Sequence, residues 1–242
     1  MKKHLKWLVP LLIVFLVLAG GTIIYINDDY DALPSAAAVL TADRPNVMVT
    51  QQPGRIIFRP QTVQAGLVFY PGGKVDYRAY APLMSDLAAR DILCVLVEMP
   101  LQLAFLNVNA ADSIYGDFPE VKNWYIAGHS LGGAAAASYA AGHKDKLDGL
   151  VLLASYAVSD LRNSGLRVLS VYGSKDGVLN RDAYEKNRIN LPEDILEVVI
   201  PGGNHASFGD YGPQKGDGTS DLAEGEQIKS TAEIISGWIF SK

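Results

Sequence analysis

The stretch N-W-Y-I-A-G-H-S-L-G-G, residues 123–133, places a serine in the pattern G-x-S-x-G between an apolar run and a helix-forming segment of small residues, 134–141. This is the layout of a nucleophile elbow, a sharp turn from strand to helix with the serine at its apex. Such a turn strains the backbone of Ser130, and glycine at Gly128 and Gly132 leaves room two positions to either side. The following helix would direct its N-terminal N–H groups toward negative charge near the serine.

Apolar runs recur on either side of this turn, and helical patterns separate them. Two short β-branched runs, 47–50 and 56–59, flank a Pro-Gly pair at 53–54, which predicts an antiparallel hairpin. The further predicted strands cover residues 66–70, 92–98, 124–127, 149–154, 167–173 and 196–200. Continuous apolar strands that alternate with helices are typical of an α/β fold, with a mostly parallel sheet and helices on both faces. Ligands of such sheets bind beyond the carboxyl ends of the strands.

The N-terminal segment differs from the rest of the chain, because residues 7–26 carry no charge and are mostly Leu, Ile and Val. A helix of this length spans the roughly 30 Å hydrocarbon core of a membrane. Lysines precede the segment and aspartates follow it, so the positive-inside rule places the remaining chain outside the cytoplasm. We therefore predict a single-pass membrane anchor in residues 1–30, a tether in 31–45 and one α/β domain in 46–242. A cleaved signal peptide, which would make the protein secreted, is the alternative.

Composition excludes some classes of partner. The net charge is −5 and the pI is near 5.3, and basic residues are scattered along the chain after the N-terminus. No basic face is predicted, which argues against nucleic acid as a partner. The single cysteine, Cys94, cannot form an internal disulfide, and its apolar surroundings in the sequence predict a small buried hydrophobic residue.

A serine hydroxyl becomes a good nucleophile when a base takes its proton and a third group orients that base. Of four histidines, His205 is the candidate base, because it follows the last predicted strand in the glycine-rich loop G-G-N-H-A. His4 precedes the apolar segment and His143 follows a predicted helix. His129, beside the serine, is expected to point away from the site.

Asp176 is the candidate for the orienting acid. It follows a predicted strand directly, in G-S-K-D-G-V, and lies between the serine and the histidine in chain order. Asp160, after the preceding strand, and Glu98, at the end of an earlier one, are its rivals.

The negative charge that develops on a substrate oxygen requires preorganised donors. The N–H of Leu131, the residue after the serine, is the first candidate donor. The second is expected in the P-G-G-K loop at 71–74, from Gly73 or from its neighbour Lys74, because glycine lets a backbone approach a substrate closely. Chemistry of this kind needs no metal ion and no organic cofactor.

These motifs give residues 45–240 a resemblance to the α/β-hydrolases, whose catalytic residues follow the chain order Ser, Asp, His. The three marks are G-H-S-L-G-G at 128–133, G-S-K-D-G-V at 173–178 and G-G-N-H-A-S-F-G-D-Y-G at 202–212. The Y-P-G-G loop at 70–73 is similar to one found in small single-domain serine hydrolases related to dienelactone hydrolase. Dienelactone hydrolase itself has a cysteine nucleophile, where this chain has Ser130.

Together, the candidate catalytic residues, the resemblance and the N-terminal segment predict a membrane-anchored, extracytoplasmic serine hydrolase. It is expected to cleave small or polymeric carboxylic esters through an acyl-enzyme intermediate. The same residues could cleave amide, thioester or lactone bonds, and a non-catalytic binding protein on a hydrolase fold is a further alternative. Two stretches border the expected site. Residues 98–106 are apolar and predict either an acyl pocket or core, and residues 207–221 predict a mobile loop, whose aspartates do not match the EF-hand spacing.

Overall fold

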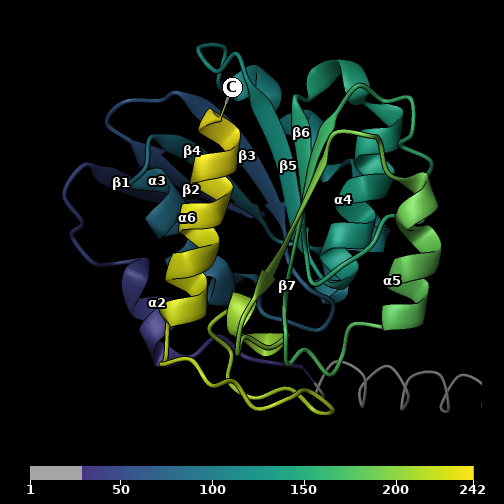
Figure 1. The fold of residues 1–242 in the computed structure, drawn as a ribbon. Coiled ribbons are helices and arrows are strands. Elements are labelled where there is room, and N and C mark those ends of the chain that lie inside the picture. Colours follow the sequence, from purple (N-terminus) through teal and green to yellow (C-terminus); the bar gives the residue numbers. More distant parts are fainter. Residues whose placement is uncertain (1–28, 242) are drawn as a thin grey trace, which may run out of the picture.

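The apolar runs of the sequence form one eight-stranded sheet in the computed structural model of the protein, which describes residues 29–241 (Figure 1). The strand order is β1-β2-β4-β3-β5-β6-β7-β8. The strands are β1 (Val47–Gln52), β2 (Arg55–Pro60), β3 (Ala65–Tyr70), β4 (Ile92–Val97), β5 (Trp124–His129), β6 (Gly149–Leu153), β7 (Arg167–Gly173) and β8 (Ile195–Ile200). The β1–β2 and β2–β4 pairs are antiparallel and the others are parallel, which confirms the predicted α/β sheet with an N-terminal hairpin.

Helices cover both faces of this sheet (Figure 1). They are α2 (Pro34–Val39), α3 (Ala81–Ala88), α4 (Leu131–Gly142), α5 (Arg181–Asn187) and α6 (Glu226–Phe240), with the short 3-10 helices η1 (Tyr77–Tyr80), η2 (Pro100–Gln102), η3 (Ala104–Ser113), η4 (Tyr115–Asp117), η5 (Lys144–Lys146), η6 (Arg188–Asn190) and η7 (Ala206–Phe208). Side chains of α3 and α6 share one apolar core with the sheet, and side chains of α4 and η3 share the other. Every residue of β3, β4 and β5 is buried, as two covered faces require.

The structure describes the predicted tether, residues 31–45, but almost none of the predicted membrane anchor, residues 1–30. The predicted membrane anchor lies outside the described residues, except for its last two positions. Within residues 29–241 no helix has both the length and the apolar character needed to cross a membrane. Residues 34–39 of the predicted tether form α2, and Ala36 is fully buried against the domain. The small side chains of its alanines let α2 pack closely on the domain. The composition of residues 31–45 does not predict this packing.

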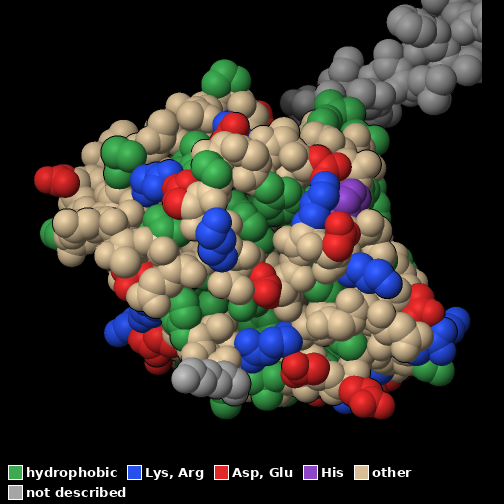
Figure 2. Space-filling view, turned by 90° about the horizontal axis from the view of Figure 1, so that it is seen from above, with side chains coloured by type: hydrophobic (Ala, Val, Ile, Leu, Met, Phe, Trp, Pro, Cys, Tyr) green, Lys and Arg blue, Asp and Glu red, His purple; other side chains and the backbone are tan. Residues whose placement is uncertain are grey.

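The surface carries charges of both signs. Figure 2 shows the molecule from the end at which α6 terminates, and acidic and basic side chains are interspersed there among hydrophobic ones. This face has no continuous basic field of the kind that nucleic-acid binding uses.

The elbow glycines predict a large difference between two glycine-to-alanine substitutions. A Cβ on Gly132 would lie 2.2 Å from the carbonyl oxygen of Pro71, a backbone atom that cannot move aside cheaply. Gly132→Ala is therefore expected to lower the free energy of unfolding by about 3 kcal/mol or more. Gly237→Ala is the control, because Gly237 lies within α6 and a Cβ there meets nothing within 4 Å.

Gly237→Ala is expected to raise the same free energy by about 0.5–1 kcal/mol, since glycine weakens a helix interior. Urea unfolding of both variants measures the difference. Equal stability of the two variants would contradict the close contact between the elbow and the end of β3.

Candidate active site

Ser130 sits at the apex of the predicted elbow, between β5 and α4. Its backbone has φ 51° and ψ −121°. Residues other than glycine rarely adopt a positive φ of this size. The turn is held by the Ser130 N–H, which donates to the carbonyl of Leu153, and by Ser155 Oγ, which donates 2.7 Å to the Ser130 carbonyl. A Cβ on Gly128 would lie 2.5 Å from the carbonyl carbon of Gly132, so the turn requires glycine there. Strain of this kind persists where surrounding structure fixes it, and it is common at active sites.

The structure brings the predicted acid and base together. Asp176 follows β7 and His205 follows β8, two neighbouring strands whose carboxyl ends lie side by side. His205 Nδ1 is 2.9 Å from Asp176 Oδ2 and 3.1 Å from Oδ1. Both side chains are almost completely buried, with 1% of His205 and 0% of Asp176 exposed. The carboxylate also accepts hydrogen bonds from the N–H groups of Val178 and Leu179.

These contacts fix the charge of Asp176. Burial raises the pKa of its carboxyl, but the hydrogen bond and charge of His205, together with the two backbone donors, outweigh burial and hold that pKa below its ordinary value. An ionised Asp176 accepts the Nδ1 proton of His205, which leaves Nε2 as the basic nitrogen. Nε2 of His205 is buried and finds no hydrogen-bond partner among residues 29–241. A buried imidazole nitrogen without a partner is available to take a proton from a hydroxyl.

The elbow and the histidine loop are in contact. The ring of His129, the residue before Ser130, lies 4.6 Å from the ring of His205, measured between centroids. No hydrogen bond joins Ser130 Oγ to His205 in the described part of the chain. Catalytic hydrogen bonds are often long in a ligand-free enzyme and tighten when substrate binds.

The candidate oxyanion donors are also adjacent. A Cβ on Gly73 would lie 2.7 Å from Leu131 Cδ2, so the loop after β3 rests directly on the start of α4. Leu131 is the first residue of that helix, and its N–H has no acceptor within the helix. The neighbouring N–H groups are engaged elsewhere, because Gly72 donates to the hydroxyl of Tyr80 and Lys74 donates to the carbonyl of Gln102. This arrangement favours Gly73 over Lys74 as the second donor.

A buried pair of side chains that the sequence motifs do not predict lies behind this loop. The hydroxyl of Tyr80 accepts the Gly72 N–H and lies 2.8 Å from Nδ1 of His129. The expectation that His129 points away was wrong, because its ring is buried between Tyr80 and His205. Burial lowers the pKa of His129 and a charge on His205 lowers it further, so this imidazole is neutral. The sequence offers one indication of this contact, because the hydroxyl of a buried tyrosine needs a hydrogen-bond partner.

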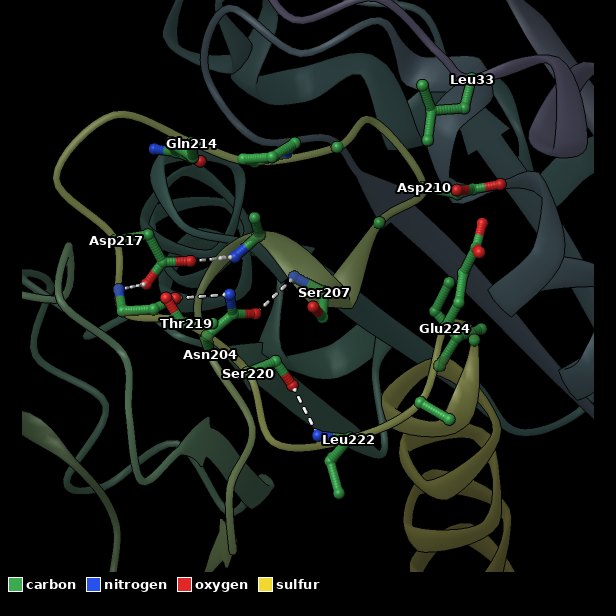
Figure 3. Close-up of a pocket in the computed structure, with 18 residues that line it drawn as sticks. Leu33, Asn204, Ser207, Asp210, Gln214, Asp217, Thr219, Ser220, Leu222 and Glu224 are labelled. Carbon is green, nitrogen blue, oxygen red and sulfur yellow. Dashed lines mark hydrogen bonds between the residues drawn. The ribbon is translucent and has the colours of Figure 1, made fainter.

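Asp217 is the second residue that sequence analysis missed. It lies beside a pocket of about 400 Å³ behind the histidine loop (Figure 3). Its carboxylate accepts four backbone N–H groups, those of Gly177, His205, Ala206 and Gly218, at 2.8 to 3.1 Å. One side chain therefore ties the loop of Asp176 to the loop of His205. The segment predicted as a mobile loop, 207–221, is fastened to the site at this point.

Asp217→Ala is expected to lower kcat by about 10- to 100-fold with little change in KM, because small displacements of catalytic groups are costly. The matched control is Asp221→Ala, since Asp221 lies in the same segment, is exposed and pairs with Lys175. Steady-state kinetics with a soluble activated ester, beside the melting temperature of each variant, make the comparison. Similar kcat values for the two folded variants would show that Asp217 does not position the catalytic loops.

The rival acids Asp160 and Glu98 lie away from His205. Asp160 is exposed and pairs with Arg162 at 2.6 Å, and Glu98 is exposed at the end of β4. Neither carboxylate forms a hydrogen bond with His205 in the described chain. Residues 29–241 contain no group of three or more His, Cys, Asp or Glu side chains that could hold a metal ion.

Comparison with known proteins identifies the family. Residues 66–229 match the model of the Alpha/beta hydrolase family. The chain belongs to the alpha/beta hydrolase family. A search of curated proteins gives no match.

Solved structures share the alpha/beta hydrolase fold. TT1662 from Thermus thermophilus superposes with a TM-score of 0.59 at 14% identity, over 81% of this chain and 99% of that one. A dienelactone hydrolase from Anabaena variabilis gives 0.57 at 17% identity, over 80% and 97%. A thermophilic esterase from Thermogutta terrifontis gives 0.56 at 13% identity, over 82% and 98%. At these identities the likeness shows the fold alone.

Proposed function

We propose that this alpha/beta hydrolase is a serine hydrolase that cleaves carboxylic esters through an acyl-enzyme intermediate. The observation that carries the proposal is the buried Asp176–His205 pair, whose Nε2 has no hydrogen-bond partner among residues 29–241. The His205 ring also contacts His129, the residue before the strained Ser130. A binding protein would gain nothing from a buried base without a partner, since an unsatisfied buried polar atom is destabilising. The name of the Thermogutta terrifontis neighbour, an esterase, agrees with this reaction class.

The reaction follows from the roles of five residues. Ser130 Oγ attacks the ester carbonyl carbon while His205 Nε2 takes the hydroxyl proton, and Asp176 stabilises the imidazolium that forms. The N–H groups of Leu131 and Gly73 receive the negative charge on the carbonyl oxygen. The tetrahedral intermediate collapses, and the alcohol leaves with the proton from His205. Water, deprotonated by His205, then attacks the acyl group on Ser130 and releases the acid.

We further propose that the domain is anchored to a membrane and lies outside the cytoplasm. The uncharged residues 7–26, preceded by lysines and followed by aspartates, support this location. If this segment is cleaved as a signal peptide, the domain is secreted.

Lactone hydrolysis is a second candidate. A lactone is an internal ester, so the same residues would open it by the same steps. The name of the Anabaena variabilis neighbour, a dienelactone hydrolase, agrees with this candidate. A panel of linear esters, lactones, thioesters and amides separates these bonds.

The test is covalent labelling with a fluorophosphonate, which reacts with activated serines. The full chain in detergent should take up one label, and peptide mapping should place it on Ser130. Protein unfolded by heat is the control and should not react, because activation depends on the folded site. A label on another serine, or no label on folded protein, would contradict the proposal.

A further inference from the structure

The chain enters the described domain at the catalytic edge of the sheet. Tyr30 forms a bridge with Val75, with its N–H 2.7 Å from the Lys74 carbonyl and its carbonyl accepting the N–H of Asp76. Asp29, one residue earlier, accepts a 2.6 Å hydrogen bond from the side chain of Gln102. These contacts lie on the loops after β3 and β4, the first of which carries the candidate oxyanion donor Gly73. The N-terminal segment therefore leaves the domain beside the candidate active site.

Three exposed apolar side chains lie within four residues of Gln102, the residue whose side chain holds Asp29. We call them the Leu101 patch, formed by Leu101, Phe105 and Leu106, with 56%, 46% and 55% of their surfaces exposed. They lie on η2 and η3, and Leu101 adjoins Gln102, the residue that holds Asp29. The sequence predicted that this stretch lines a pocket or joins the core, and these three side chains lie at the surface instead.

The backbone of the patch is strained. Leu101 and Gln102 both lie in the left-handed region, with φ 50° and φ 56°. Two consecutive non-glycine residues in this region are unfavourable, and such strain persists where it serves a site or is fixed by its surroundings. Here the strained residues are the exposed Leu101 and Gln102, whose side chain holds Asp29.

Chain length limits how far the patch lies from the apolar N-terminal segment. That segment ends at Ile26, three residues before Asp29. Consecutive Cα atoms are 3.8 Å apart, so at most about 11 Å separates the two Cα positions, whatever path residues 27 and 28 take. If residues 7–26 span a bilayer, the surface of that bilayer lies close to Asp29. It is then also close to Gln102, which is hydrogen-bonded to Asp29, and to the neighbouring Leu101.

We infer that the Leu101 patch docks on the lipid bilayer in which residues 7–26 are anchored, so that the catalytic edge faces the membrane and takes esters held there. This inference rests on the proposed function for the substrate and on the proposed anchor for the lipid surface. At the entry, Arg78 is paired with Asp76, and the exposed acids Asp31 and Glu98 lie beside them. These groups carry more negative than positive charge, which makes attraction to anionic headgroups unfavourable. The contact is therefore apolar, and neutral phosphatidylcholine suffices.

The first test locates the patch relative to lipid without requiring activity. The full chain carrying Phe105→Cys is labelled with a polarity-sensitive fluorophore and reconstituted into phosphatidylcholine vesicles with a lipid-borne quencher. Phe240→Cys is the matched control, because Phe240 is 43% exposed and ends α6 at the opposite end of the molecule (Figure 1). The native Cys94 is buried, and burial raises the pKa of its thiol, so it does not compete for the label.

The label at 105 is expected to shift to the blue and to be quenched, while the label at 240 is not. Equal behaviour at the two positions would overturn the docking inference, even if the protein proves to be an active esterase.

The second test concerns the substrate. Phe105→Asp is expected to lower the rate on a vesicle-borne ester by about ten-fold, the order expected for a lost buried aromatic contact, and to leave the rate on a soluble ester unchanged. Phe240→Asp should change neither rate. Equal losses on both substrates would show that the patch serves the fold or the pocket and not docking. Absence of hydrolysis in the wild type would refute the proposed function and leave the fluorescence result as the measure of docking.

Discussion

Replacing Ser130 with alanine is expected to lower kcat for an activated ester by about 10⁶-fold, the loss that follows removal of a catalytic serine in enzymes of this mechanism. The substitution removes only Oγ, and alanine tolerates the elbow as well as serine does, so folding should be unaffected. Single-turnover kinetics and circular dichroism of the purified full chain measure the two effects. The residual rate reports what Leu131 and Gly73 contribute through the oxyanion and binding alone.

Ser207→Ala is the control, because Ser207 lies two residues from His205 and has no role in the proposed mechanism. It should retain wild-type kcat. A Ser130→Ala protein that keeps more than a small part of the activity would assign the nucleophile to another residue.

Asp176→Asn is expected to lower kcat by about 10⁴-fold while the fold is retained. An amide in place of the carboxylate no longer requires the proton on Nδ1 of His205, so the imidazole presents its proton to Ser130 instead of a lone pair. The hydrogen bond and charge of His205 and two backbone donors hold the pKa of Asp176 below its ordinary value, so the wild-type carboxylate is charged near neutral pH. Steady-state kinetics near neutral pH measure the loss of kcat, and circular dichroism measures the retention of the fold.

The rival acid supplies the control for this substitution. Asp160 pairs with Arg162 on the surface, so Asp160→Asn should leave kcat unchanged. If Asp160→Asn is inactive and Asp176→Asn is active, the assignment of the acid is reversed.

The fold was predictable because it depends on local patterns. Strands such as β3 and β4 are continuous apolar runs, and the elbow around Ser130 is signalled by two glycines that steric contact requires. The sheet topology then brings the ends of β7 and β8 together, which is why Asp176 and His205 could be paired from the sequence.

The supporting contacts could not be predicted in the same way. Asp217 reaches the N–H groups of His205 and Gly177 only because the segment 207–221 folds back over the site, and no periodic pattern specifies that path. Tyr80 is fully buried, and no pattern of apolar residues signals that its hydroxyl lies beside Nδ1 of His129. Burial of α2 likewise depends on tertiary contacts, with α3 and η1.

The bridge formed by Tyr30 has a mechanical consequence. A pull on the chain ahead of Asp29 is borne first by the hydrogen bonds of Tyr30 with Lys74 and Asp76, and by that of Asp29 with Gln102. Two of these bonds lie directly after Gly73 in the chain, so tension at the N-terminus reaches the loop of this candidate oxyanion donor before any strand of the sheet is loaded. The contacts that attach the N-terminal chain and the loop that carries Gly73 are thus mechanically coupled.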